Sequence, residues 1–329
     1  MDGDAPAAAP VPGAPVPADV LAAAGRLRGV ARRTPLERSA WLSQQVGRDV
    51  LLKLETAQRT GSFKVRGAYN AVALLPGEVR ERGLVTASAG NHGQGVALAA
   101  SLHGARSLVF VPRSAPEAKK RRIARFGAEL REVDGGYDEA HHAAEAHAAA
   151  SGAAFVHGFS DPAVVAGGGT VGLEILEDAP GVRTLVVPVG GGGLAGGIGV
   201  IARALSPGIR IVGVQTPQTA AMHASLAAGR LVSPPYGETL CEGLSGDVDE
   251  RSLSLARAVV DEVVLVDEDA VRAAVRRLYE EEGVVAEGSA AVAVAALLEG
   301  VMGDVEGPVA AVLTGGNVDA RRLAAILAG

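Results

Sequence analysis

The sequence is poor in cysteine, because Cys241 is the only one among its 329 residues. A lone cysteine can form no intrachain disulfide and cannot build a zinc site from two or four thiolates. This usage is typical of a reducing compartment, so we expect a cytoplasmic protein. The N-terminus carries Asp2 and Asp4 and no apolar run, so no signal peptide is predicted.

Aromatic residues and positive charge are scarce as well. Aromatic residues make up 3% of the chain, and the formal net charge is −6. Few rings give little stacking surface for bases, and an acidic chain lacks an electrostatic footprint for nucleic acid or anionic membranes. We therefore expect no nucleic-acid or membrane partner. The charge-free stretch 184–202 could span a membrane by length, but Pro188 and six glycines in 190–197 favour a strand, a turn and a buried helix.

Glycine and hydrophobic residues, by contrast, are plentiful. The 44 glycines are about twice the usual share of ~7%, and 48% of the residues are hydrophobic. Short apolar runs alternate with amphipathic helical patterns, which predicts parallel sheets covered by helices. The predicted strands are 50–54, 84–88, 107–112, 129–133, 154–157, 184–188, 210–215, 262–266 and 309–314, and the clearest helices are 93–103, 117–126, 138–150 and 269–282. Residues 1–17, with five of the 17 prolines among alanines, predict a disordered tail before a helix that begins at Asp19.

Four loops that follow predicted strands have unusual compositions. Ligands in parallel α/β folds bind at the carboxyl ends of strands, so these loops are candidates for one site. The loops are 60–67 (TGSFKVRG), 88–95 (SAGNHGQG), 188–197 (PVGGGGLAGG) and 313–319 (LTGGNVD).

Each loop offers one chemical function. Lys64, between small residues and an aromatic one, can become a nucleophilic amine in a dry pocket. The second and third loops run into helices whose first N–H groups bind anions such as a carboxylate or a phosphate. Thr314 adds a hydroxyl. An amine, two anion sites and a hydroxyl fit a cofactor with an aldehyde and one phosphate, pyridoxal 5′-phosphate.

The third loop also matches a dinucleotide fingerprint. Gly191, Gly193 and Gly196 satisfy G-x-G-x-x-G, but the next strand ends at Gln215 with no acidic residue nearby to hold a ribose. The P-loop pattern G-x-x-x-x-G-K-[ST] is absent too. A single phosphate monoester therefore fits better than a dinucleotide.

Together the four motifs closely resemble those of the serine/threonine dehydratases in order and spacing, over about residues 18–325. These enzymes have fold type II of the pyridoxal-phosphate enzymes, the fold of the tryptophan synthase β subunit. The resemblance implies two open, twisted parallel-sheet domains. Residues 18–70 and 159–329 would form a discontinuous large domain that binds the cofactor, and residues 71–158 a small inserted domain. It also implies a homodimer.

The resemblance assigns a role to each matching residue. Lys64 is expected to be the catalytic residue and to hold the cofactor as a Schiff base. The other expected cofactor-binding residues are Phe63 beside the ring, Asn91 at the ring hydroxyl, Gly190, Gly191, Gly192, Gly193 and Leu194 at the phosphate, Glu287 near the ring and Thr314 at the ring nitrogen. The residues expected to bind the substrate are Ser88, Ala89, Gly90, His92 and Phe159.

The implied reaction is elimination of water from a 3-hydroxy amino acid, first L-threonine or L-serine, to give a 2-oxo acid and ammonia. The alternatives are another 3-hydroxy amino acid (3-hydroxyaspartate or a phenylserine-like compound), serine racemisation, β-replacement as in cysteine synthase, and a catalytically silent ligand-binding homologue. The retained Lys64 argues against the last of these, and Phe159 resembles dehydratases rather than cysteine synthase.

Serine racemase resembles the chain strongly but differs at three positions. It has a serine acid/base where this chain has Ala89, and two metal-holding carboxylates where this chain has Gln215 and Ala221. A methyl group cannot transfer a proton, so we expect a dehydratase without a metal site. The chain ends about ten residues after the TGGNVD motif, so we expect no C-terminal regulatory domain.

Three other groups of residues are interpreted as structural. His141, Glu145 and His147 with their neighbour His142 are expected on a solvated helix face, and no H-E-x-x-H spacing supports zinc. The basic run 119–122 is expected at the surface. Cys241 is expected to be a small buried apolar residue.

Overall fold

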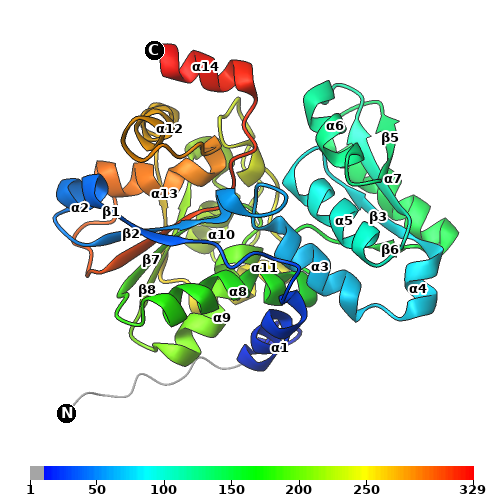
Figure 1. Cartoon of the computed structure of the whole chain (residues 1–329), viewed down its shortest axis with the longest axis horizontal. Helices are drawn as coiled ribbons and strands as arrows, with labels where there is room; N and C mark the ends of the chain where they lie inside the picture. The colour runs from blue at the N-terminus through cyan, green and yellow to red at the C-terminus, as the bar shows by residue number, and fades with distance from the viewer. Residues whose placement is uncertain (1–10) are drawn as a thin grey trace.

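The computed structural model describes residues 11–329, which fold into two domains, each built on its own sheet (Figure 1). The larger sheet has six strands, and only its edge pair β1–β2 is antiparallel. In spatial order the strands are β1 (Leu36–Ser39), β2 (Val50–Leu54), β10 (Val309–Leu313), β7 (Thr184–Pro188), β8 (Arg210–Gln215) and β9 (Glu262–Leu265). We call this part the six-stranded domain.

Helices cover both faces of this sheet (Figure 1). One face carries α2 (Ala40–Val46), α12 (Glu268–Glu282) and α13 (Gly288–Glu299), with α14 (Ala320–Ala328) against α12. The other face carries α8 (Pro162–Asp178), α9 (Gly193–Leu205), α10 (Ala221–Ala228) and α11 (Glu250–Val259). Three short 3-10 helices, η1 (Glu55–Ala57), η2 (Pro217–Thr219) and η3 (Glu242–Leu244), lie in the connections.

The second domain, which we call the four-stranded domain, has a fully parallel sheet. Its strands in spatial order are β5 (Glu129–Val133), β4 (Ser107–Pro112), β3 (Leu84–Ala87) and β6 (Ala154–Phe155). The helices α3 (Lys64–Leu74) and α5 (Asn91–Leu102) pack on one face, α7 (Tyr137–Ser151) packs on the other, and α4 (Gly77–Arg82) and α6 (Glu117–Ala124) complete the domain.

The central strand β10 shows why its sequence forms a buried strand. Side chains alternate between the two faces of a sheet. Val309, Ala311 and Leu313 therefore pack towards α13, while Ala310 and Val312 pack towards the α8–α9 side. All five residues are fully buried, which explains the continuous apolar run, and helices cover both faces of such strands.

The expected domain boundary after residue 70 falls inside a helix. The structure continues α3 without a break to Leu74, and this helix packs against both α5 and α8. Gly67 makes that contact possible, because a Cβ there would lie 2.6 Å from the backbone oxygen of Val164 in α8. The helix is thus shared between the domains, and Gly67 allows it to pack closely against α8.

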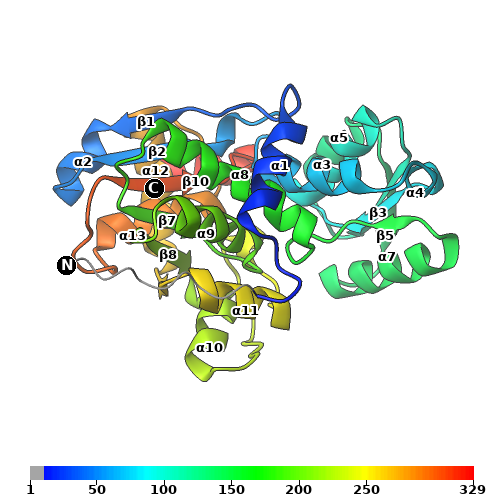
Figure 2. The ribbon, with the colours of Figure 1, turned by 90° about the horizontal axis from the view of Figure 1, so that it is seen from below.

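The prediction of a disordered tail over residues 1–17 does not hold for the last part of that range. Its residues 1–10 lie outside the described residues, but Pro15 is buried, and Ala14 packs against the cluster formed by α1 (Pro17–Leu27), α8, α9 and α11. The helix α1 also begins at Pro17, two residues before Asp19, because proline is well tolerated in the first helical turn. Figure 2 shows α1 beside α8, where the two domains meet.

The charge-free stretch 184–202 forms β7, a turn and most of the buried helix α9, as predicted. In residues 11–329, no helix combines the length and the apolar character needed to cross a membrane.

Candidate active site

Three segments of the six-stranded domain are joined by backbone hydrogen bonds. Ser62 and Gly315 form an isolated antiparallel bridge, and the N–H of Phe63 donates to the carbonyl oxygen of Thr314 at 3.0 Å. The N–H of Glu287 donates to the carbonyl oxygen of Gly315 at 3.1 Å. The loop after β2, the loop after β10 and the start of α13 are therefore fixed against one another.

Lys64 is the first residue of α3, and its amine faces the connection between the domains. Its Nζ donates to the carbonyl oxygen of Gly158 at 2.9 Å and lies 5.1 Å from the centre of the Phe63 ring. Among the described residues, no carboxylate lies within ion-pair distance of this amine. Burial lowers the pKa of Lys64 to about 8, although the charge of Glu287 acts in the opposite direction. A group of this kind is a candidate base and nucleophile.

Asn91 begins α5 and is hydrogen-bonded on both sides of its amide. Its Nδ2 donates to Oε1 of Glu287 at 2.7 Å, and its Oδ1 accepts from Nδ2 of Asn317 at 2.7 Å. The same nitrogen of Asn317 donates to the carbonyl oxygen of Thr60 at 2.8 Å. Burial raises the pKa of Glu287, and the hydrogen bond from Asn91 opposes that rise. This chain connects the two domains across the site.

The rest of the loop after β3 places backbone N–H groups at the start of α5. Ser88 and Ala89 follow the strand, and the N–H of Gly90 donates to Oγ of Ser88 at 3.1 Å. The Nε2 of His92 is hydrogen-bonded to the carbonyl oxygen of Val156 at 3.0 Å, and its buried Nδ1 has no partner among the described residues. Burial, with help from the charge of Lys64, lowers the pKa of His92 to about 3. The ring is therefore neutral at physiological pH.

The glycine-rich turn after β7 fits an anion. Gly192 has a left-handed backbone (φ +90°) and precedes α9, whose buried second residue is Leu194. In residues 11–329, the N–H groups of Gly190, Gly191 and Gly192 donate to no acceptor, so three backbone donors are free beside a helix N-terminus. This is the pattern that a phosphate group requires.

The same glycines also make room for Phe159. A Cβ at Gly191 would lie 2.5 Å from the Phe159 ring, and one at Gly193 would lie 2.2 Å from the Phe159 carbonyl oxygen. Phe159 follows Gly158, the acceptor for Lys64, so the amine and the glycine turn meet at this connection. Two of the glycines that are expected at the phosphate are therefore also required by the packing of Phe159.

Two hydroxyl groups complete the arrangement. Thr314 is buried, and its Oγ1 makes no hydrogen bond to any described residue. The buried Oγ of Ser62 in the adjoining loop has no partner there either. Buried polar groups are normally paired, so unpaired donors suggest a ligand. An amine of lowered pKa, free N–H groups on a turn and an unpaired hydroxyl together fit pyridoxal 5′-phosphate.

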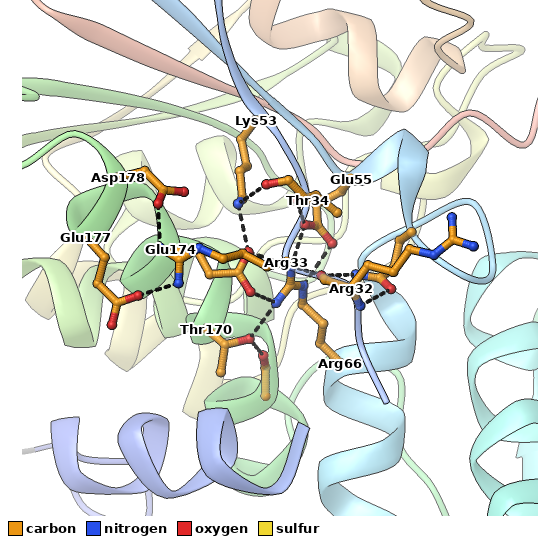
Figure 3. Close-up of polar contacts among 12 residues, drawn as sticks. Arg32, Arg33, Thr34, Lys53, Glu55, Arg66, Thr170, Glu174, Glu177 and Asp178 are labelled. Carbon is orange, nitrogen blue, oxygen red and sulfur yellow. Dashed lines mark hydrogen bonds and ion pairs between the residues drawn. The ribbon is translucent and has the colours of Figure 1, made fainter. Parts of the chain in front are cut away.

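A cluster of buried charges surrounds the guanidinium of Arg66 in α3 (Figure 3). Arg66, two residues after Lys64, makes two hydrogen bonds to Glu55, at 2.7 and 2.9 Å, and two to Glu174, also at 2.7 and 2.9 Å. Nζ of Lys53 donates to Glu174 at 2.7 Å, and the hydroxyl of Thr34 donates to Glu55 at 2.6 Å. The cluster ties α3 to β2, η1 and α8.

Charge pairing outweighs burial in this cluster. Burial alone would raise the pKa of Glu55, but the charge and hydrogen bonds of Arg66 bring it below its ordinary value. Likewise, burial would lower the pKa of Arg66, and its two carboxylate partners raise it instead. Arg66 and Asn317 lie in the predicted loops 60–67 and 313–319, but no role was predicted for them or for Glu55 and Glu174.

The three groups of residues that the sequence analysis interpreted as structural differ from one another in burial and contacts. Cys241 is fully buried, as predicted. The basic run 119–122 is only partly at the surface: Lys120 is buried against Glu132, and Arg122 donates to the carbonyl oxygen of Val318 in the other domain. The prediction missed this because the partner segments are distant in sequence. His141 pairs with Glu145 at 3.4 Å on α7.

Comparison with known proteins places the chain among relatives that cover most of its length. A family model described as pyridoxal-phosphate dependent enzyme matches residues 27–315. L-threonine ammonia-lyase of Thermotoga maritima is 44% identical over 314 residues, which are 94% of this chain and 77% of the relative.

Two solved structures have the same fold. A threonine deaminase of T.th. has a TM-score of 0.87 and 36% identity, with 93% of this chain and 99% of that chain covered. Maize serine racemase has a TM-score of 0.90 and 31% identity, with 95% and 96% covered. The two neighbours carry different activities, so residues within the site must discriminate between them.

Proposed function

The chain belongs to the family of pyridoxal-phosphate-dependent enzymes, and we propose that it eliminates water from L-threonine or L-serine, giving a 2-oxo acid and ammonia. The observation that carries this proposal is the Lys64 amine, whose pKa is lowered to about 8 by burial. An amine that is partly unprotonated near neutral pH can serve first as a nucleophile and then as a base. The presence of Lys64 argues against the alternative of a catalytically silent ligand-binding protein.

The surrounding residues would hold the cofactor from three sides. The free N–H groups of the Gly190–Gly193 turn, with Leu194, would bind the phosphate. Asn91, held by Glu287, would donate an N–H to the ring hydroxyl, while Thr314 would face the ring nitrogen and Phe63 would pack beside the ring. Bound pyridoxal phosphate would supply the electron-withdrawing group that makes the Cα–H bond of the substrate acidic.

The chain's own groups would then perform the elimination. The loop of Ser88, Ala89, Gly90 and His92 would bind the substrate carboxylate at the start of α5, with Phe159 closing the pocket. The Lys64 amine would remove the Cα proton, and the hydroxyl on Cβ would leave with a proton as water. Hydrolysis of the released enamine consumes one water and frees ammonia, so the net reaction neither consumes nor produces water.

Serine racemisation is the second candidate, favoured by the fold of maize serine racemase. Two residues argue against it. Ala89 offers no proton on the opposite face of the substrate. The side chain of Gln215 is neutral and hydrogen-bonded, because it donates to the carbonyl oxygen of Thr219 at 2.6 Å and accepts from the N–H of His223 at 2.8 Å, which supports the expectation that it holds no metal ion.

The test is a substrate panel of L-threonine, L-serine, 3-hydroxyaspartate and phenylserine, supplied to the purified protein with pyridoxal phosphate. We expect equal amounts of 2-oxo acid and ammonia from L-threonine or L-serine. Chiral chromatography on the L-serine reaction provides the second readout. Formation of D-serine without pyruvate would replace the elimination proposal with racemisation.

Domain organisation, assembly and location are further parts of the proposal. We propose that residues 71–158 form the inserted domain and that residues 18–70 and 159–329 form the other, with the helix α3 (Lys64–Leu74) continuing across the boundary at residue 70. The lone, buried Cys241 supports a cytoplasmic location. A homodimer rests on the family resemblance, and light scattering on the eluted protein would test it directly.

A further inference from the structure

The amide of Asn91 could face the site with either its nitrogen or its oxygen, and only the nitrogen can donate to a ring hydroxyl. A carboxamide has two donors on one end and an acceptor on the other. The contacts that determine which end of the Asn91 amide faces the site are therefore as important as the presence of Asn91 itself. The hydrogen-bonded neighbours of this amide give the answer.

These neighbours form a chain whose two ends accept hydrogen bonds. One end is the backbone carbonyl of Thr60, and the other is the carboxylate of Glu287. Asn317 must point its nitrogen at the Thr60 carbonyl, and the same nitrogen also reaches Oδ1 of Asn91. Asn91 must then point its nitrogen at Glu287. Any reversed amide would bring two oxygens or two nitrogens together.

Glycines make space for this chain. Gly61 has a left-handed backbone, and a Cβ there would lie 2.8 Å from Oδ1 of Asn317. A Cβ at Gly315 would lie 2.7 Å from Oε1 of Glu287. The two polar side chains therefore rest directly on backbone, in loops that are themselves hydrogen-bonded together. The arrangement leaves one N–H of Asn91 without a partner among the described residues.

We propose that Asn317 is a positioning residue, which through its amide nitrogen fixes the orientation of Asn91 so that the remaining N–H of Asn91 faces the cofactor ring. This inference rests on the proposed function, which places Asn91 at the ring hydroxyl. Asn317 itself touches neither cofactor nor substrate in this scheme. It acts only by holding the Asn91 amide in one of its two orientations.

The test compares the dissociation constant of pyridoxal phosphate and the pH titration of its visible absorbance band among holoenzyme variants. Asn317→Ala and Asn91→Ala should each weaken binding by about three- to tenfold and shift the band in the same direction, as loss of one hydrogen bond predicts. The double variant should be no weaker than Asn91→Ala. Additive effects would overturn the inference, because they would mean that Asn317 acts independently of Asn91.

A second variant separates hydrogen bonding from space filling. Asn317→Asp keeps the shape but presents an oxygen to the Thr60 carbonyl and to Oδ1 of Asn91, so it should bind the cofactor as poorly as Asn317→Ala. Wild-type behaviour of Asn317→Asp would refute the positioning role. Asp319→Asn, in the same loop but exposed at the start of α14, is the matched control and should match wild type.

The outcomes also separate this inference from the proposed function. If Asn91→Ala has no effect on affinity or on the band, the role of Asn91 fails and the inference fails with it. If Asn91→Ala has its effect and Asn317→Ala has none, only the inference fails. Melting temperatures measured for every variant identify any that are unfolded, and the aspartate variant then decides the outcome.

Discussion

Lys64 and Arg66 are two cations on the first turn of α3, yet their surroundings are opposite. Arg66 lies between two carboxylates and has a raised pKa, whereas the Lys64 amine donates to a backbone carbonyl, forms no ion pair with any described residue, and has a pKa of about 8. Both side chains are removed from water to a large degree. The difference lies in the partners. The two carboxylates stabilise the charge on Arg66, whereas the amine of Lys64 has no such partner among the described residues and can release its proton.

The comparison assigns separate tasks to the two residues. A paired guanidinium cannot be deprotonated, so Arg66 anchors the helix to β2 and α8. Lys64, whose amine forms no ion pair with any described residue, is the first residue of the same helix, so the anchoring by Arg66 also fixes its position. Variants that disturb one residue should therefore leave the property of the other largely unchanged.

Lys64→Ala should have the largest effect on catalysis. Removal of the only amine in the site should reduce kcat by about 10⁴-fold, at the upper end of what a positioned base contributes. The visible absorbance band that appears when pyridoxal phosphate binds should also be lost. Spectra and 2-oxo acid assays on the purified variant measure both effects.

Lys119→Ala is a matched control, since that amine lies outside the site and is paired with Glu242. It should retain the band. If the Lys64→Ala enzyme kept both the band and its activity, Lys64 would not be the residue that holds the cofactor and acts as the base.

Glu55→Gln should have the largest effect on stability. The change leaves Arg66 buried with one carboxylate instead of two, and breaking a buried pair costs about 3–5 kcal/mol in the free energy of unfolding. Urea unfolding monitored by circular dichroism measures it. At temperatures where the variant is folded, the visible band of the holoenzyme should stay at the wild-type wavelength.

The same cluster supplies a matched surface control (Figure 3). Glu177 pairs with Arg33 at 2.6 Å, but both side chains are about half exposed (48% and 50%). Exposed pairs contribute roughly 0–1 kcal/mol, so Glu177→Gln should change the unfolding free energy by less than about 1 kcal/mol. Equal losses for Glu55→Gln and Glu177→Gln would contradict the distinction between buried and exposed pairs.

The sequence predicted most of this fold because the parallel strands are buried on both faces. Their continuous apolar runs stand out, and five of the nine predicted strands, among them β2 and β7, have the predicted bounds. The strand β1 was missed because it is an edge strand with two exposed residues, Glu37 and Arg38, and a single buried one. A half-exposed strand of four residues carries too little hydrophobic pattern to be recognised.

The sequence motifs predicted the residues of the candidate site. They did not predict the buried ion pairs around Arg66 that anchor α3. Lys64 and Asn91 lie in loops with a distinctive composition, but the partners of Arg66 include Glu174, which is 108 residues away. Charged residues such as Lys53 are usually exposed, so their burial cannot be inferred before the partners are brought together. Long-range pairing of this kind becomes visible only in the folded chain.

The pH dependence of cofactor capture tests the lowered pKa of Lys64. Below pH 8 the amine of the apoenzyme is mostly protonated and cannot attack an aldehyde, so the capture rate should rise about tenfold per pH unit from 6 towards 8 and then level off. Stopped-flow measurement of the visible band gives the rate. Reaction of pyridoxal phosphate with Nα-acetyl-lysine amide corrects for ionisation of the cofactor itself. A rate that kept rising beyond pH 10 would show an ordinary, unperturbed lysine.

Glu242→Gln should have the smallest effect and completes the comparison with an exposed contact between the domains. Glu242 accepts from Lys119 of α6 and, at 2.7 Å, from Arg322 of α14, and nearly half of its side chain is exposed. Water screens such contacts, so the unfolding free energy should fall by less than about 1 kcal/mol, and the difference should disappear in 1 M salt. Urea unfolding at low and high salt measures it, with Glu55→Gln as the salt-insensitive reference. A loss as large as that of Glu55→Gln would mean that the exposed contact between the domains is as strong as the buried cluster.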